Sequence, residues 1–89
     1  MKSVKTKYIK GVINMEELME ILSELRPDVD FENETSLITD GVLDSFDIIA
    51  LVSELDEAFD IEIKPNNLVP ENFNSAKAMM ALIEQLQDE

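Results

Sequence analysis

The segment from Asp44 to Phe59 constrains the fold more than any other part of this chain. Its apolar residues recur at the spacing of one helix face, and they are Ile48, Leu51, Val52, Leu55 and Phe59. Asp44 stands where an N-cap belongs, because its carboxylate can accept a hydrogen bond from a backbone N–H group of the first turn. The segment therefore predicts a helix that starts after Asp44, ends at about Phe59 and buries one face.

A second helix is predicted over Met15–Leu25, where apolar and glutamate residues alternate at helical spacing. Asn14 can cap it, and Glu17 completes a capping-box pattern. The helix should end before Pro27, because a proline pushes the residue before it, Arg26, out of the helical region.

The C-terminal part predicts one long helix and one short one. Ser75 is the expected cap of the long helix, whose inward stripe is Ala76, Met79, Leu82, Ile83 and Leu86. Residues 66–73 are compatible with a short helix around Pro70. Residues 27–43 form a long connection, and some of its apolar side chains should tuck beneath the helices. The predicted fold is all-α, a small bundle of three long helices and one short one.

Charge is distributed unevenly along the chain. Residues 1–14 hold four lysines and no acidic residue, whereas residues 15–89 hold 20 acidic and three basic residues, a net charge of −17. We therefore divide the chain into a basic N-terminal extension or leader, 1–14, and a folded domain, 15–89. Such an acidic domain repels nucleic acid and anionic membranes and attracts proteins with basic surfaces.

Composition excludes several kinds of chemistry. The chain has no histidine and no cysteine, so a serine activated by histidine and metal sites of imidazole or thiolate are both excluded. No glycine-rich phosphate loop is present, and no apolar run approaches the roughly 20 residues of a membrane span. The absence of cysteine fits a reducing cytoplasm. These observations predict a cytoplasmic protein with no metal site.

Ser45 carries the functional signal. It places a hydroxyl directly behind the Asp44 cap, at the start of a long helix. The free N–H groups and the positive end of the helix dipole favour an anion there, so the position suits a phosphodiester. Ser45 is therefore expected to be modified rather than to act as a nucleophile in a reaction of its own.

The run Asp44-Ser45-Phe46, with Gly41 before it and an acidic amphipathic helix after it, resembles the Asp-Ser-Leu signature of acyl carrier proteins. The resemblance extends from about Met15 to the C-terminus. It implies an acyl-carrier-like four-helix bundle and a covalent 4′-phosphopantetheine arm on Ser45, donated from coenzyme A, with Asp44 as the helix cap beside it. It also implies a carrier that is not itself an enzyme, whose partners are a phosphopantetheinyl transferase and the enzymes that load and transfer acyl or aminoacyl groups. We expect a monomer.

Partner enzymes with basic docking surfaces are expected to contact the helix that follows Ser45. Phe46 and Ile49 fall beside the inward stripe, so they are either core residues or an exposed apolar strip for docking. The carboxylates of Asp47, Asp56 and Glu57 are expected to face solvent and to steer partners.

Three functions remain open at this point. Asp47 and the segment Phe59-Asp60-Ile61-Glu62-Ile63 resemble fatty-acid-type carriers. The aliphatic stripes of the helices predicted after Asp44 and Ser75, with the adaptable Met79 and Met80, can yield to an acyl chain, so we predict an acyl carrier protein of fatty acid biosynthesis. Phe46 directly after the serine, and Phe73-Asn74-Ser75, are more similar to D-alanyl carrier proteins, so an aminoacyl or peptidyl carrier is the alternative. An acidic protein-interaction module with an unmodified Ser45 is the alternative from another class.

Overall fold

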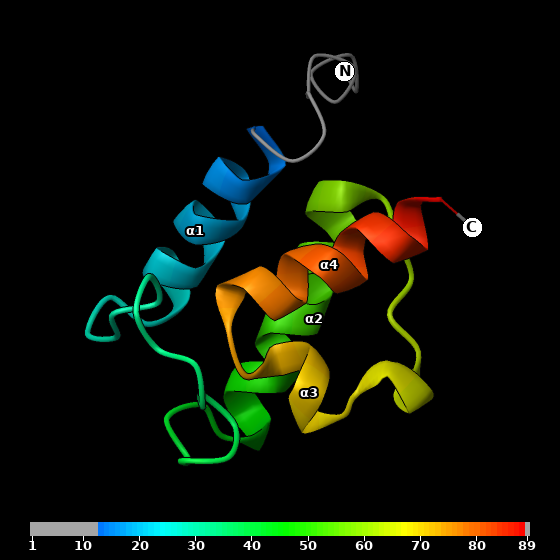
Figure 1. Cartoon of the computed structure of the whole chain (residues 1–89). Helices are drawn as coiled ribbons and strands as arrows, with labels where there is room; N and C mark the ends of the chain where they lie inside the picture. Colours follow the sequence, from blue (N-terminus) through cyan, green and yellow to red (C-terminus); the bar gives the residue numbers. More distant parts are fainter. Residues whose placement is uncertain (1–12, 89) are drawn as a thin grey trace.

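The computed structural model describes residues 13–88, which form an all-helical domain (Figure 1). The long helices are α1 (Ile13–Leu25), α2 (Ser45–Phe59) and α4 (Ala76–Gln87). Between α2 and α4 lie a 3-10 turn, η2 (Pro65–Asn67), and the short helix α3 (Pro70–Phe73). The predicted fold class, with three long helices and one short one, is confirmed within the described residues.

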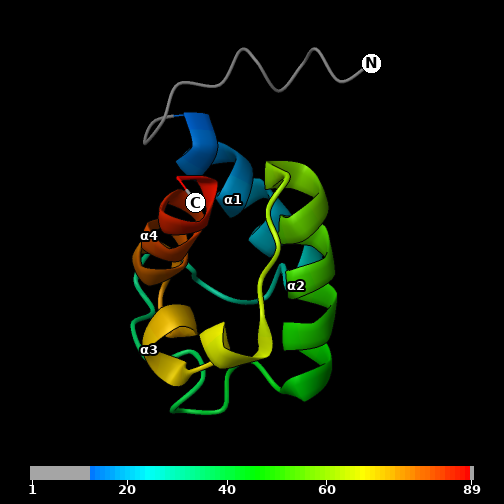
Figure 2. The ribbon, with the colours of Figure 1, turned by 90° about the vertical axis from the view of Figure 1, so that its right-hand side faces the viewer.

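The helices pack around one apolar core. Helix α1 contacts both α2 and α4, and α3 contacts α4. In Figure 2, α2 and α4 stand on either side of the core, and the chain after α2 runs back beside it toward η2 and α3. The side chains that are completely shielded from solvent are Leu18, Leu22, Leu37, Leu51, Leu55, Met79 and Ile83. The inward residues of the three long helices, together with Leu37 of the connection, therefore form the centre of the domain.

Helix α2 begins and ends close to the predicted residues. It runs from Ser45 to Phe59, with Asp44 as its N-cap. At its C-terminal end Asp60 adopts a left-handed conformation, with φ of 57°. The next turn is held by Asp56, whose Oδ1 accepts a hydrogen bond from the Ile63 N–H group at 3.0 Å. The Asp56 carboxylate, expected to be mostly solvent-facing, is partly buried, and it fastens the chain that leaves α2.

The start of α1 differs from the prediction. The helix already includes Ile13 and Asn14, so Asn14 is not its N-cap. A capping-box spacing recurs by chance in a glutamate-rich segment, and here the helix continues past it in the N-terminal direction. The helix therefore crosses the domain boundary that was predicted after residue 14. The rest of the proposed extension, 1–12, lies outside the described residues.

The long connection between α1 and α2 is tied down by its own apolar residues, as expected. Phe31, Leu37 and Leu43 are buried, and Val29 and Ile38 pack partly against the core. The Leu43 N–H group donates to the Leu37 carbonyl at 3.0 Å, which closes the last part of the connection into a compact turn. A connection of this length keeps a defined shape because its side chains share the core with the helices.

Asn74, between α3 and α4, holds this turn from outside. Its Oδ1 accepts hydrogen bonds from the N–H groups of Ile38 and Thr39 at 2.9 and 3.0 Å. Its Nδ2 donates to the Thr39 hydroxyl at 3.1 Å, and its carbonyl accepts from the Leu37 N–H group at 2.9 Å. One residue thus satisfies three backbone donors of the connection and fixes it against the end of α3.

We predict that Asn74→Ala lowers the free energy of unfolding by about 1–3 kcal/mol, because two backbone N–H groups lose their acceptor. Urea unfolding measures the change. The matched control is Asn66→Ala, which alters an exposed asparagine in η2. A loss no larger than that of the control would show that water replaces the Asn74 side chain at no cost.

Candidate functional site

Ser45 is the first residue of α2 and is exposed to solvent. An α-helix leaves its first N–H groups without carbonyl partners inside the helix. At α2, two of these groups, those of Asp44 and Asp47, donate to carboxylates of the same turn. The N–H groups of Ser45 and Phe46 point the same way along the axis, so an anion on the serine oxygen lies at the positive end of a 15-residue helix.

A reciprocal capping box shapes this turn. Asp44 Oδ1 accepts from the Asp47 N–H group at 2.9 Å, and Asp47 Oδ2 accepts from the Asp44 N–H group at 3.1 Å. The prediction of Asp44 as N-cap is confirmed. The usual capping-box pattern ends in Glu or Gln, so the Asp-x-x-Asp spacing by itself does not predict the return bond to Asp47.

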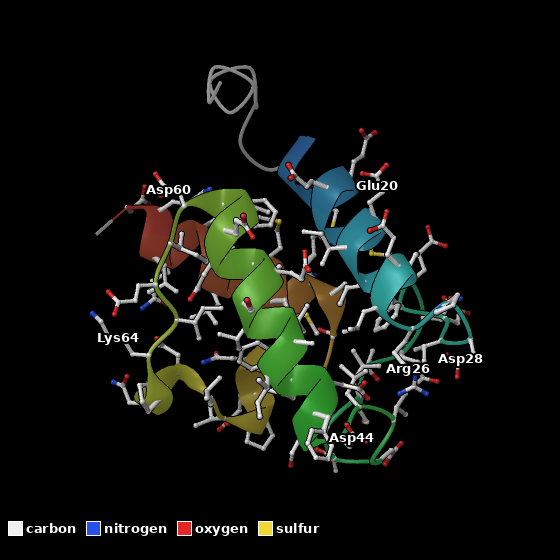
Figure 3. The ribbon with its side chains drawn as sticks, turned by 180° about the vertical axis from the view of Figure 1, so that it is seen from behind. Glu20, Arg26, Asp28, Asp44, Asp60 and Lys64 are labelled. Carbon is white, nitrogen blue, oxygen red and sulfur yellow. The ribbon has the colours of Figure 1, made fainter. Side chains whose placement is uncertain are left out.

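Arg26 joins this turn to the end of α1. Its Nη1 donates to Asp47 Oδ2 at 2.8 Å and to the Val42 carbonyl at 3.0 Å. Nε and Nη2 form a fork onto both oxygens of Asp28, at 3.0 and 2.9 Å. Figure 3 shows the Arg26 side chain between the loop that follows α1 and the start of α2, close to Asp44. A single guanidinium therefore links three parts of the chain.

These pairings shift the ionisation of the partners. The hydrogen bond from Arg26 holds the pKa of the Asp28 carboxyl below its usual value, and the hydrogen bond to Asp28 raises the pKa of Arg26. Both groups are consequently charged at neutral pH. The Asp47 side chain is only 16% exposed, so the expectation that its carboxylate faces solvent is wrong. Asp47 accepts hydrogen bonds from both the cap and the arginine.

Apolar surface lies next to Ser45. Phe46 and Ile49 are 81% and 67% exposed, so they lie outside the core. An open depression of about 450 Å³ begins at Asp44 and Ser45, and its apolar lining is Ile38, Leu43, Ile48, Ile49 and Leu68. A smaller apolar hollow of about 80 Å³ lies beside it, lined by Ile38, Ile48, Leu68, Val69, Pro70 and Phe73. The hydroxyl therefore opens onto an apolar surface between α2 and the η2–α3 segment.

The five residues expected to dock partners fall into two groups. Phe46, Ile49 and Glu57 are exposed, which keeps them accessible to a partner protein. Asp47 and Asp56 accept hydrogen bonds from within the domain. Docking by any of the five stays a prediction.

Comparison with known proteins decides the family. Two D-alanyl carrier proteins of Lactococcus lactis, from subspecies lactis strain IL1403 and subspecies cremoris strain MG1363, are each 36% identical to the chain over 66 residues. The match covers 74% of this chain and 78% of each relative. The chain belongs to the phosphopantetheine-binding carrier protein family. No family model matches it.

Membership of the carrier protein family means that the protein is not an enzyme. Within residues 13–88, no helix is long and apolar enough to span a membrane. The same part of the chain contains no group of three or more acidic residues placed to hold a metal ion. The geometry fits the prosthetic group of the family, because an exposed hydroxyl, a helix N-terminus and an open depression meet at Ser45.

Two residues important for the site of this carrier protein carried no functional signal in the sequence. In the sequence, Arg26 is only the residue before a proline, and Asn74 is only part of a resemblance. Both act on residues far away in the chain, Arg26 on Asp47 and Asn74 on Ile38 and Thr39. A contact across 21 to 36 positions leaves no periodicity or spacing that a single sequence displays.

Gly41 allows the turn before the site of the carrier domain. Its φ is +72°, and its N–H group donates to the Ile38 carbonyl at 3.0 Å. A Cβ atom added here would meet nothing within 4 Å. Glycine is therefore favoured for its backbone conformation, and space is not the reason.

We predict that Gly41→Ala lowers the free energy of unfolding by about 1–2 kcal/mol, the penalty of a left-handed conformation for a residue with a Cβ atom. Gly41→Asn is the matched control, and it should lose less, because asparagine enters this region more readily. Urea unfolding of the three proteins measures the order. An alanine variant as stable as the parent would contradict the prediction.

Proposed function

We propose that this protein is an aminoacyl carrier that holds D-alanine as a thioester on a 4′-phosphopantetheine arm attached to Ser45. One observation supports this most: an exposed serine opens α2 beside an apolar depression, in a chain 36% identical to D-alanyl carrier proteins. When bound, the arm supplies the thiol that this cysteine-free chain lacks.

The attachment is a phosphoryl transfer from coenzyme A. Ser45 Oγ forms a bond to the phosphorus that bears the pantetheine, and the bond from that phosphorus to the bridging oxygen of the pyrophosphate breaks. Adenosine 3′,5′-bisphosphate leaves with the bonding electrons, and the hydroxyl proton passes to a base of the transferase. The chain has no histidine to accept that proton, so its own contribution is to expose Oγ and orient the helix N-terminus.

The packing favours a small cargo over a fatty one. A long acyl chain needs an apolar cleft, and the inward residues of α2 and α4, such as Leu55 and Met79, are fully shielded. The depression of about 450 Å³ that Ser45 lines is open on the surface. The apolar hollow beside it measures about 80 Å³, less than the roughly 150 Å³ of an engineered cavity that holds benzene. An alanyl thioester needs no such space. These features, together with the names of the relatives, lead us to prefer D-alanine to the fatty acyl group expected at first.

The partners follow from the same surface. A phosphopantetheinyl transferase and an adenylating ligase would each dock where Phe46 and Ile49 are exposed. The negative charge of the domain attracts enzymes with basic docking surfaces. Tethering raises the effective concentration of the aminoacyl group at each docked enzyme. We place this exchange in the cytoplasm, where coenzyme A and ATP are available, with the carrier as a monomer.

The proposed function is tested in two stages with purified protein. Incubation with a phosphopantetheinyl transferase and coenzyme A should add the mass of one arm, and peptide mapping should locate it on Ser45. The loaded protein should then accept D-alanine from an adenylating D-alanine ligase and ATP. The resulting thioester should be released by hydroxylamine.

Two variants serve as controls. Ser45→Ala should abolish loading, whereas Ser53→Ala, which removes another exposed serine of α2, should leave it unchanged. Absence of any arm on the parent protein would favour the interaction module. An arm that accepts octanoyl groups but not D-alanine would restore the fatty-acyl interpretation.

The docking prediction concerns Phe46. Because its side chain is 81% exposed, Phe46→Ala should change the free energy of unfolding by less than about 0.5 kcal/mol. The same variant should lose apolar contact area with the transferase, so the KM for the carrier should rise by roughly tenfold. Steady-state loading kinetics and urea unfolding give the two quantities.

Leu55→Ala provides the contrast, because Leu55 belongs to the same helix but is fully buried. It should lower stability by about 2–5 kcal/mol. Below its unfolding transition, its KM should remain near the parent value. A Phe46→Ala protein that unfolds, or that keeps the parent KM, would contradict a docking role.

A further inference from the structure

Attachment of the arm poses an electrostatic problem at the start of α2. Coenzyme A is anionic, and the phosphodiester formed on Ser45 keeps a negative charge. Ser45 lies between Asp44 and Asp47, in a domain with a net charge of −17 over residues 15–89. The two carboxylates belong to the same helix turn as the acceptor hydroxyl, and their negative charge opposes the approach of the phosphate.

Each carboxylate is compensated differently. The Asp44 carboxylate accepts a hydrogen bond from the Asp47 N–H group and lies at the positive end of the helix. Asp47 is 2.8 Å from the Arg26 guanidinium and only 16% exposed, so this pair is partly shielded from solvent and from salt. The arginine is shared with Asp28, whose side chain is 65% exposed and therefore well solvated. Asp47, which water reaches least, depends on the guanidinium for compensation.

Arg26 is the basic residue that pairs with the first turn of α2. Residues 13–88 contain two others, Lys64 and Lys77. Figure 3 shows Lys64 on the opposite side of α2 from Arg26. Lys77 lies in the first turn of α4 and lines a groove with Met15 and Met19 of α1. Neither lysine replaces the arginine at Asp47.

We propose that Arg26 is a positioning residue for the transfer of phosphopantetheine to Ser45. It acts through Asp47. It neutralises this carboxylate, so that the negative phosphate can approach Oγ, while Asp47 Oδ2 accepts hydrogen bonds from both the guanidinium and the Asp44 N–H group. The inference rests on the proposed function, because it presupposes that Ser45 receives the arm.

If Arg26 only held α1 against α2, its variants would affect loading in a different way. In that case the important feature is the contact between α1 and α2, and any loss of the Arg26–Asp47 pair would be equally harmful. If charge is what matters, removing both charges restores the site. The amide side chain introduced by Asp47→Asn still offers an oxygen to the Asp44 N–H group, so the capping box survives the change.

The experiment compares four variants in transferase kinetics with the full chain: Arg26→Lys, Arg26→Gln, the double variant Arg26→Gln/Asp47→Asn, and Lys77→Gln. Arg26→Gln should lower kcat for loading by about tenfold, because the Asp47 carboxylate then lacks its positive partner and repels the incoming phosphate. Its KM should not rise, because the added net negative charge attracts a basic transferase. Lys77→Gln makes the same change in net charge elsewhere and should stay within about twofold of the parent kcat.

The Arg26→Lys and double variants distinguish a role of the Arg26 charge from a role as a structural link between α1 and α2. Arg26→Lys and the double variant should both recover most of the parent kcat, and amide exchange should show the first turn of α2 intact in all four proteins. The inference fails if Arg26→Gln loads like the parent or like Lys77→Gln. It also fails if the double variant stays as slow as the single one. If the parent protein takes no arm at all, the proposed function fails instead, so the two failures are distinguishable.

Discussion

The ion pair between Arg26 and Asp47 is the interaction on which the geometry of this carrier domain depends most. It lies where the end of α1, the long connection and the first turn of α2 meet. The Asp47 carboxylate also accepts a hydrogen bond from the Asp44 N–H group. The position of the helix start is therefore coupled to the position of α1. A half-buried pair with several hydrogen bonds tolerates little displacement, because separation would leave a charge poorly solvated.

The long connection is held by polar contacts at its surface and apolar ones beneath. Asn74 satisfies donors of the turn around Ile38, and Leu37 and Leu43 anchor the same turn in the core. The left-handed conformation of Gly41 then lets the chain reverse just before Asp44. Ser45 is exposed as a consequence of this arrangement, since the turn and the helix cap both direct the first residue of α2 outward.

The site combines features that a stable fold alone would not need. A phenylalanine that is 81% exposed gains nothing from burial in the isolated domain. Acidic residues crowd the surface, although their mutual repulsion weakens the compact state. Both features are explained if other proteins cover this surface for part of the time. The family relationship gives the same account, because a carrier must be bound by several enzymes in turn.

The sequence by itself determined the helices, the core stripes, the Asp44 cap and the family, because helical periodicity and capping act over a few residues. It misplaced the start of α1, where a capping pattern occurred by chance, and it left Phe46 and Ile49 undecided between core and surface. Tertiary structure decided those positions, and it alone brought Arg26 to Asp47 and Asn74 to Ile38. Such contacts depend on how the helices pack around the connection, and that packing is a property of the whole chain rather than of any short segment within it.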